Sequence, residues 1–262
     1  MGPTSQCVDR DAARNALCMH SLAMTQLSKP PVSKRVSMSR FDAVRCSASR
    51  RPAKTPGAQV PVRMLVLYGS CRSGSRSRAL AHEAARVARD AGAQVQIFEP
   101  EGLPLAGNDD VQNAKLKSLH ELVGWADGFV WCSPEHHAAM SGVMKLILDC
   151  YPCENGRPAD VQGKTVMLMQ VSGGSLSSNA ISDMQRVATA MALHVMPKAV
   201  AVPKSAGQFD EANKLRDASL GSRLESGVRE FVQLTLLHRA NASWLAETRR
   251  EPEDGGTLQS SA

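Results

Sequence analysis

The sequence predicts an α/β fold built on one parallel sheet, and two observations carry this prediction. From Val62 onward, short apolar runs alternate with segments of helical periodicity. Strict β-α alternation of this kind is typical of a parallel sheet that is covered by helices on both faces. The chain has 262 residues, of which 43% are hydrophobic, so one large domain with a real core is expected.

Five short apolar runs are expected to form the strands: Val62–Leu67, Val95–Phe98, Gly128–Cys132, Thr165–Val171 and Val195–Val202. Helices are expected between them, at about 75–91, 111–126 and 177–193. Two further segments place apolar side chains on one helical face at i, i+3, i+4 and i+7 spacing. The apolar positions of these two segments are Met140, Val143, Met144, Ile147 and Leu148, and then Leu224, Val228, Phe231 and Val232.

Charge divides the chain into two parts. Residues 1–63 hold eleven Lys and Arg against three acids, a net charge of +8, whereas the remaining 20 basic and 22 acidic residues give −2. A nearly neutral domain argues against a nucleic-acid-binding face. No apolar run approaches the roughly 20 residues of a membrane-spanning helix, so no membrane partner is expected either.

The first 61 residues are predicted to be a disordered, basic targeting segment. They are rich in Ser and poor in acids, a composition that is typical of organelle transit peptides. Val44-Arg45-Cys46 before Ser47-Ala48 resembles a plastid processing site, so a plastid is the expected location. A mitochondrion, the cytoplasm and an ordinary basic tail stay open as alternatives. Residues 62–245 are expected to form the domain, and residues 246–262 a disordered polar tail.

The loops after strands one, three and four should hold the ligand, because parallel sheets bind ligands beyond the carboxyl ends of their strands. Seven of the ten residues from Gly69 to Arg78 are Ser or Arg. This loop lacks the G-x-G-x-x-G pattern, and it lacks the Lys of a phosphate-binding loop of nucleoside triphosphatases. At the start of a helix, such a loop suits one terminal phosphate group. A solvated Ser-rich loop is the alternative.

The other two loops suit a flat heterocycle. "CSPEHHAAM" reads as a strand-to-helix turn that offers backbone N–H groups, and its adjacent His136 and His137 do not share a helix face, so no metal is expected. "QVSGGSLSSNA" contains Gly173-Gly174, where the backbone can approach a ligand closely. Read alone, it would equally fit an ordinary Gly-rich turn with a capping Ser.

Together, "YGSCRSGSRSRAL", "WCSPEHHAAMSGVMK" and "MQVSGGSLSSNA" resemble the signature segments of the NADPH-dependent FMN reductases, and most closely the ArsH-type flavoproteins. The resemblance covers roughly residues 62–240. It implies a flavodoxin-like three-layer α/β/α sandwich, with a five-stranded parallel sheet in the order 2-1-3-4-5. It also implies that FMN lies across the carboxyl edge of the sheet, and that the protein forms a homodimer or a homotetramer.

The resemblance also implies which residues bind the cofactor. The FMN phosphate would contact the first loop, the isoalloxazine would lie along the second, and the third would close its other side. These residues are Ser70, Arg72, Ser75, Ser77 and Arg78, then Pro134, Glu135, His136, His137 and Ala138, and then Ser172, Gly173 and Gly174.

The implied reaction passes a hydride from NADPH to FMN, and then electrons to a quinone, azo dye, metal ion or oxygen. ArsH-type members are linked to the oxidation of trivalent organoarsenicals. The cofactor carries the chemistry, so no side chain is expected to be catalytic, and Glu135, His136 and His137 are expected to position the rings. A flavodoxin-type electron carrier and an FMN-free scaffold are the alternatives.

The chain departs from the family pattern at several positions. Ala138 stands where the family has Gly, Leu176 and Ser178 replace a Gln and an aromatic residue, and Cys150 replaces a Trp. These changes put the acceptor side of the pocket in doubt. Cys150 and Cys153 form a C-x-x-C pair that follows a helix, whereas reactive thiols prefer helix N-termini, so both are expected to be incidental.

Overall fold

The first predicted strand forms as β1, Arg63–Tyr68, and its last five residues are buried. The computed structural model describes residues 60–105, 113–154, 157–158 and 160–247, so nearly all of the predicted targeting segment and polar tail lies outside the described residues. The other strands are β2 Gln94–Phe98, β3 Gly128–His136, β4 Ala139–Met140, β5 Cys153–Glu154, β6 Arg157–Pro158, β7 Thr165–Val171, β8 His194–Val195 and β9 Val200–Val202.

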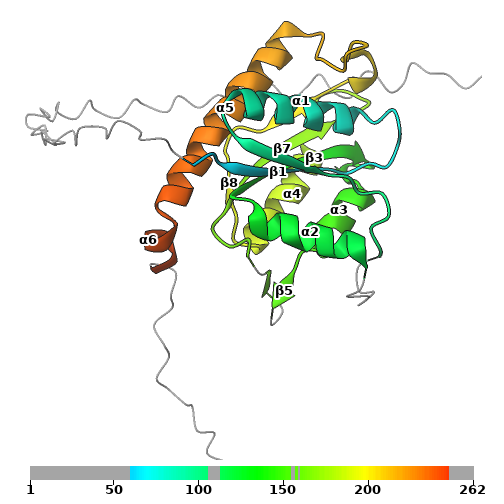
Figure 1. Ribbon diagram of the computed structural model, residues 1–262. Helices are drawn as coiled ribbons and strands as arrows, with labels where there is room; N and C mark the ends of the chain where they lie inside the picture. The colour runs from blue at the N-terminus through cyan, green and yellow to red at the C-terminus, as the bar shows by residue number, and fades with distance from the viewer. Residues whose placement is uncertain (1–59, 106–112, 155–156, 159, 248–262) are drawn as a thin grey trace, which may run out of the picture. The chain divides into compact units, whose positions relative to one another are not determined.

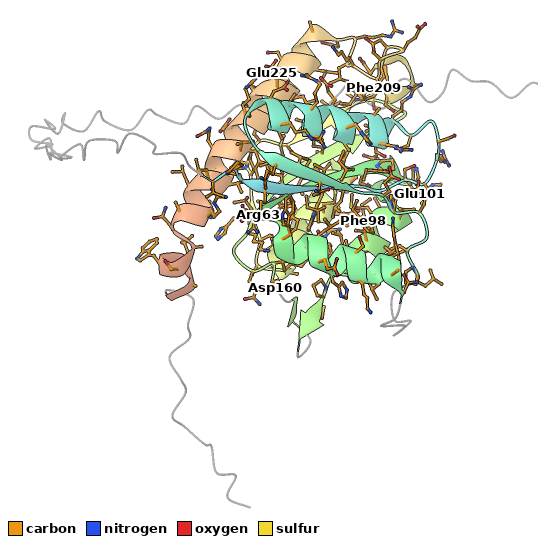
Figure 2. All side chains as sticks on the ribbon, in the orientation of Figure 1. Arg63, Phe98, Glu101, Asp160, Phe209 and Glu225 are labelled. Atoms are coloured by element: carbon orange, nitrogen blue, oxygen red, sulfur yellow. The ribbon has the colours of Figure 1, made fainter. Side chains whose placement is uncertain are left out.

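The principal strands pair in parallel, in the order β2-β1-β3-β7, and both β8 and β9 then pair with β7. When β8 and β9 are taken as two halves of the fifth strand, the predicted order 2-1-3-4-5 is confirmed. The carboxyl ends of these strands all meet at one edge of the sheet. Figure 2 shows this edge on the side of Glu101, and the opposite edge at Arg63.

The predicted fifth strand is interrupted. Val195 pairs with Val166, and Val200 pairs with Met169. Between these two pairs the chain advances five residues in the fifth strand but only three in β7. Pro197 lies within this interruption. Since proline has no backbone N–H group, it cannot donate to a strand ladder, and the chain bulges there.

Helices cover both faces of the sheet (Figure 1). Met64, Val66 and Tyr68 of β1 belong to the core beneath α1 and α5, while Leu65 and Leu67 belong to the core beneath α2, α3 and α4. This alternation follows from the two-residue period of a strand. The helices are α1 Arg76–Asp90, α2 Ala114–Trp125, α3 Gly142–Asp149, α4 Asn179–Ala190, α5 Ala218–Ala240 and α6 Ala242–Glu247, with a 3₁₀ turn, η1, at Ser205–Gly207.

The helical periodicities are confirmed by burial. Met144, Ile147 and Leu148 of α3 are buried, as are Leu224, Val228, Phe231 and Val232 of α5. Within the described ranges, no helix is long and apolar enough to cross a membrane.

A buried carboxylate secures the edge of the sheet that lies opposite the predicted ligand loops. Asp127 accepts hydrogen bonds from the Arg63 backbone N–H and guanidinium, both at 2.9 Å, and from the Arg239 guanidinium at 3.0 Å. Its side chain is only 8% exposed. Burial opposes the ionisation of Asp127, but the bonds from Arg63 and Arg239 outweigh it and hold the pKa of this carboxyl below its usual value.

Asp127→Asn should therefore lower the free energy of unfolding by about 2 kcal/mol at neutral pH, because two guanidiniums lose their buried anion. The carboxylate's contribution is complete above the unfolded-state pKa of about 3.9 and is lost as pH falls through the lowered folded-state value. The free energies of unfolding of the wild type and of Asp127→Asn, measured in urea, should therefore converge in acid. The exposed Asp90, which pairs with Arg86, gives the control Asp90→Asn, which should change stability by less than about 1 kcal/mol. Equal losses in both variants would contradict this account.

Candidate functional site

The loop from Gly69 to Ser75 folds back on itself before α1 begins. The Ser75 N–H donates to the Arg72 carbonyl at 3.1 Å, and the Arg72 N–H donates to the Ser70 hydroxyl at 3.3 Å. Ser75 is the N-cap of α1, where its hydroxyl accepts the Arg78 N–H at 3.1 Å. The start of α1 thus presents N–H groups and hydroxyls to the sheet edge, which is a favourable environment for an anion.

Gly69 brings this loop against the start of α3. A Cβ at Gly69 would lie 2.4 Å from the Ser141 hydroxyl and 2.7 Å from the Met144 Cβ, so no larger residue fits without movement. The Ser141 hydroxyl donates to the Gly69 carbonyl at 2.7 Å and accepts the Met144 N–H at 3.1 Å. The Ser133 hydroxyl in turn accepts the Ser141 N–H at 3.0 Å. The first and second loops are therefore fixed to each other through buried hydroxyls.

The second loop is a β-hairpin and not the simple strand-to-helix turn that was predicted. β3 continues four residues beyond the predicted end and pairs with β4. In this pairing Glu135 lies opposite Met140, and His136 lies opposite Ala139. The two residues at the tip, His137 and Ala138, have φ angles of 50° and 60°. Two left-handed residues in a two-residue loop make the tight turn that suits the twist of a hairpin.

Glu135 connects this hairpin to the third loop. Its carboxylate accepts hydrogen bonds from the Ser177 hydroxyl, from the Gln170 amide at 2.9 Å and from the Asn179 amide at 3.3 Å. The Ser177 hydroxyl is the main cause that lowers the pKa of Glu135 below its usual value. Gln170 completes the connection, because its other amide atom accepts the Ile181 N–H at 3.0 Å.

The third loop is also held by the segment that follows the fifth strand. The Ser172 N–H donates to the Val202 carbonyl at 3.0 Å, and the Ser172 carbonyl accepts the Ser205 N–H at 2.9 Å. The Lys204 N–H donates to the Gly174 carbonyl at 2.9 Å. These backbone bonds place Gly173 at the sheet edge, where its α-carbon faces open space.

The three loops line one pocket of about 330 Å³, here called the central pocket. It contains eight of the thirteen predicted cofactor-binding residues, and also Gly74, Arg76, Val171 and Ser205, which the sequence reasoning did not assign. The eight are Ser70, Arg72, Ser75, Ser77, Pro134, Glu135, His136 and Gly173. The sequence holds a signal for Ser205, since it lies three residues after the fifth strand, at the same sheet edge.

The other five predicted residues do not line the central pocket. The Arg78 guanidinium pairs with Glu99 at 3.0 Å and lies 5.8 Å above the Tyr68 ring. His137 and Ala138 are exposed at the hairpin tip. Ser172 is buried, and its hydroxyl donates to the Ser175 carbonyl at 3.3 Å. The Gly174 carbonyl accepts the Lys204 N–H.

A larger pocket of about 950 Å³, here called the α3 pocket, adjoins the central pocket and shares Ser70, Arg72 and His136 with it. Its wall along α3 carries Val143, Leu146 and the ion pair of Lys145 with Asp149, and Leu105 borders it. Pockets of this size and mixed lining are typical of small-molecule sites.

The two cysteines of the C-x-x-C pair lie in different surroundings. Cys150 is buried and Cys153 is exposed, and both are unpaired thiols. Burial raises the pKa of the Cys150 thiol, which opposes formation of the reactive thiolate. In the described part of the chain, no three His, Cys, Asp or Glu side chains gather closely enough to hold a metal ion.

Ala138→Gly should stabilise the protein by about 1 kcal/mol, because only glycine adopts a left-handed φ without a steric penalty. The measurement is the free energy of unfolding in urea. Ala139→Gly is the matched control. Ala139 lies in β4, where glycine should instead destabilise the protein by roughly 0.5–1 kcal/mol. Equal destabilisation by both changes would contradict the strain assigned to Ala138.

Comparison with known proteins shows the family to which the chain belongs. Residues 62–207 match the sequence profile of the family described as NADPH-dependent FMN reductase. The chain is 40% identical over 194 residues to "NADPH-dependent FMN reductase ArsH" of Acidithiobacillus ferrooxidans, covering 74% of this chain and 82% of that protein. It is 39% identical over 208 residues to the ArsH of Rhizobium meliloti, covering 79% and 85%.

The fold has solved counterparts. The flavoenzyme NAD(P)H:(acceptor) oxidoreductase FerB of Paracoccus denitrificans superposes with a TM-score of 0.58 at 19% identity, covering 68% of this chain and 98% of that one. This likeness shows a shared fold. The profile match and the two relatives show more: the chain belongs to the NADPH-dependent FMN reductase family, an enzyme family that uses FMN and NADPH.

Proposed function

We propose that the central pocket binds FMN, with the phosphate at the start of α1 and the ring system between the second and third loops. The observation that carries this proposal is the polarity of the pocket. Ser70, Arg72 and Ser75 of the first loop supply hydroxyls, a cation and a helix N-terminus, whereas the second and third loops add Pro134 and Gly173 to the lining. An anionic group joined to a flat heterocycle fits this arrangement.

When bound, FMN supplies the hydride acceptor and electron donor of the reaction. The protein binds the cofactor, orients it and limits access to it. Arg72 provides the charge that opposes a phosphate dianion, and the Ser75 cap fixes the helix start that receives it. The backbone around Pro134 and His136 can present its polar groups to one edge of the ring, where negative charge develops on reduction.

Glu135 positions these groups and transfers no proton. Its carboxylate already accepts hydrogen bonds from Gln170, Ser177 and Asn179, and these bonds favour the ionised form. A carboxylate held in this way is a poor general base, but it fixes the distance between the second and third loops.

The α3 pocket suits the electron acceptor. It opens from the central pocket at Arg72 and His136, and its apolar side chains Leu105, Val143 and Leu146 favour a flat, weakly charged molecule. One relative is a "NADPH azoreductase" and another an "NAD(P)H:quinone oxidoreductase". We therefore propose a quinone or an azo compound as the acceptor, with a trivalent organoarsenical as the narrower candidate from the ArsH resemblance.

Three properties of the whole chain belong to the same proposal. The composition of residues 1–61 supports a targeting segment that directs the protein to a plastid. The resemblance to the family supports a homodimer or homotetramer, and likewise a domain over residues 62–245. Localisation of a full-length fluorescent fusion and light scattering of the purified protein test the first two.

The proposed function predicts that the purified chain carries a visible flavin band that bleaches when NADPH is added without oxygen. Subsequent addition of a quinone should restore the band, because the quinone accepts electrons from the reduced flavin and reoxidises it. The measurement is the visible spectrum before and after each addition. A flavin band that ignores NADPH would instead indicate an electron carrier, and a protein that takes up no FMN would refute the assignment of the central pocket.

Glu135→Ala should weaken FMN binding about tenfold, because the second and third loops lose their common anion. Amide hydrogen exchange over residues 172–178 should become faster, and Glu135→Gln should restore part of both properties by retaining an acceptor. The pH dependence of kcat should be unchanged in Glu135→Gln, since the residue moves no proton. Glu121→Ala, at an exposed position on α2, is the control. An altered pH profile would make Glu135 an acid–base residue.

A further inference from the structure

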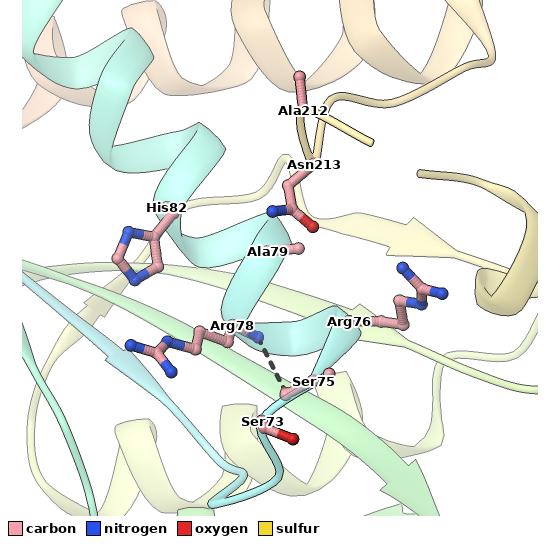
Figure 3. Close-up of a pocket in the computed structure, with 9 residues that line it drawn as sticks. Ser73, Ser75, Arg76, Arg78, Ala79, His82, Ala212 and Asn213 are labelled. Atoms are coloured by element: carbon pink, nitrogen blue, oxygen red, sulfur yellow. Dashed lines mark hydrogen bonds between the residues drawn. The ribbon is translucent and has the colours of Figure 1, made fainter. Parts of the chain in front are cut away.

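A third pocket of about 470 Å³, here called the α1 pocket, is lined by the later part of the first loop from Ser73 onward, whereas the α3 pocket is lined by its earlier part, Gly69 to Arg72. It shares Gly74, Ser75 and Arg76 with the central pocket. Figure 3 shows it between the first turns of α1 and the segment that carries Ala212 and Asn213. The central pocket thus has two neighbours, and the α1 pocket is the one that shares the start of α1, where the FMN phosphate is proposed to bind.

Two cations, Arg78 and Arg76, line the α1 pocket, and only Arg76 also lines the central pocket. The guanidinium carbon of Arg76 lies 5.9 Å from the centre of the buried Phe209 ring, an arrangement that holds the charge at the pocket wall. Arg78 lies on the other side of the pocket, and Figure 3 shows the two guanidiniums directed apart. The charge of Arg78 is already matched by Glu99, at 3.0 Å.

The remaining walls offer neutral hydrogen-bonding groups over a small apolar floor. Burial and the neighbouring Arg78 lower the pKa of His82, so its ring is neutral at neutral pH and offers one donor and one acceptor. Ala79 and Ala212 are the apolar members of the lining. Neutral polar groups beside methyl groups suit a purine base, and a guanidinium suits a phosphate.

The loop that carries Asn213 is held firmly. The Asp210 N–H donates to the Lys214 carbonyl at 3.0 Å, and the Asn213 N–H donates to the Asp210 carbonyl at 3.0 Å. Phe209 and Leu215 form a β-bridge at its base. Asn213 itself has a φ of 59°, and Figure 3 shows its amide directed toward α1. The amide is therefore presented to the pocket by a closed turn.

We propose that the α1 pocket binds the adenosine 2′-phosphate end of NADPH, with Arg76 contacting the 2′-phosphate and Asn213 the adenine. The proposal rests on the proposed function, because it extends the hydride donor from the central pocket along the first loop. The α3 pocket is the poorer candidate for this end. Its Lys145 is already paired with Asp149, and its lining along α3 is largely apolar.

The direct test is calorimetric titration of the FMN-loaded full-length protein with 2′,5′-ADP, which carries the adenosine 2′-phosphate without the nicotinamide. Arg76→Ala and Asn213→Gly should each weaken binding about tenfold, as expected for the loss of one strong hydrogen-bonding contact. Glycine at position 213 keeps the positive φ while it removes the amide. Arg86→Ala, on α1 outside the pocket, is the matched control and should leave binding unchanged.

Steady-state kinetics separate the two roles. Arg76→Ala should raise the KM for NADPH about tenfold and leave the KM for NADH unchanged, because NADH lacks the 2′-phosphate. Asn213→Gly should raise both values, because both cofactors carry adenine. The FMN dissociation constant, measured by flavin fluorescence, should change less than about threefold in Asn213→Gly, because Asn213 does not line the central pocket.

Two results with the variants would overturn the proposal. One is unchanged 2′,5′-ADP affinity in both variants, and the other is loss of FMN from Arg76→Ala with normal 2′,5′-ADP binding by Asn213→Gly. The proposed function fails separately. Wild-type protein that binds 2′,5′-ADP but whose flavin ignores NADPH would retain the α1 pocket and refute the reductase. Wild-type protein whose flavin bleaches with NADPH but that does not bind 2′,5′-ADP would support the reductase and refute the α1 pocket.

Discussion

The close contact of Gly69 with the start of α3 is the constraint on which the site depends. The Ser141 hydroxyl caps α3 and also donates to the Gly69 carbonyl at 2.7 Å, so one buried oxygen joins two loops that are 72 residues apart. No side chain fits at Gly69, since even a Cβ would lie 2.4 Å from this oxygen. The position of the whole first loop at the sheet edge follows from this contact.

A second polar centre, Glu135, extends the same construction to the third loop. Ser141 holds the first loop against the start of α3 beyond the hairpin, and Glu135 holds the hairpin against Gln170 and Ser177. Both centres use short or charge-assisted hydrogen bonds in partly or fully buried surroundings, where an unmade bond is costly. The pocket is therefore preorganised, which lowers the entropy that cofactor binding must overcome.

The fold and the location of the site follow from patterns that a single sequence displays. Alternating strands and helices predict the sheet, and the carboxyl-edge rule selects the three loops. The hairpin at His137 and Ala138 was not predictable in this way, because neither residue is a usual left-handed turn residue. The Arg78 guanidinium pairs with Glu99, which lies 21 residues away in the sequence. The motif does not reveal this partner, so the motif alone would assign the guanidinium to the phosphate. Ser205 was not predicted because the expected ligand loops were those after strands one, three and four, whereas Ser205 follows the fifth strand.

The distribution of charge explains how a nearly neutral domain can bind two anionic cofactors. From Gly69 to Arg78 the loop has three arginines and no acid, although residues 64–262 carry a net charge of −2. Charges act over roughly 8 Å at physiological salt, so a local excess is sufficient. Arg72 lines the central and α3 pockets, Arg76 lines the central and α1 pockets, and Arg78 is neutralised by Glu99. In the proposed assignment the folded loop holds these three side chains apart, so that the phosphate of FMN and the 2′-phosphate of NADPH would each meet a different guanidinium.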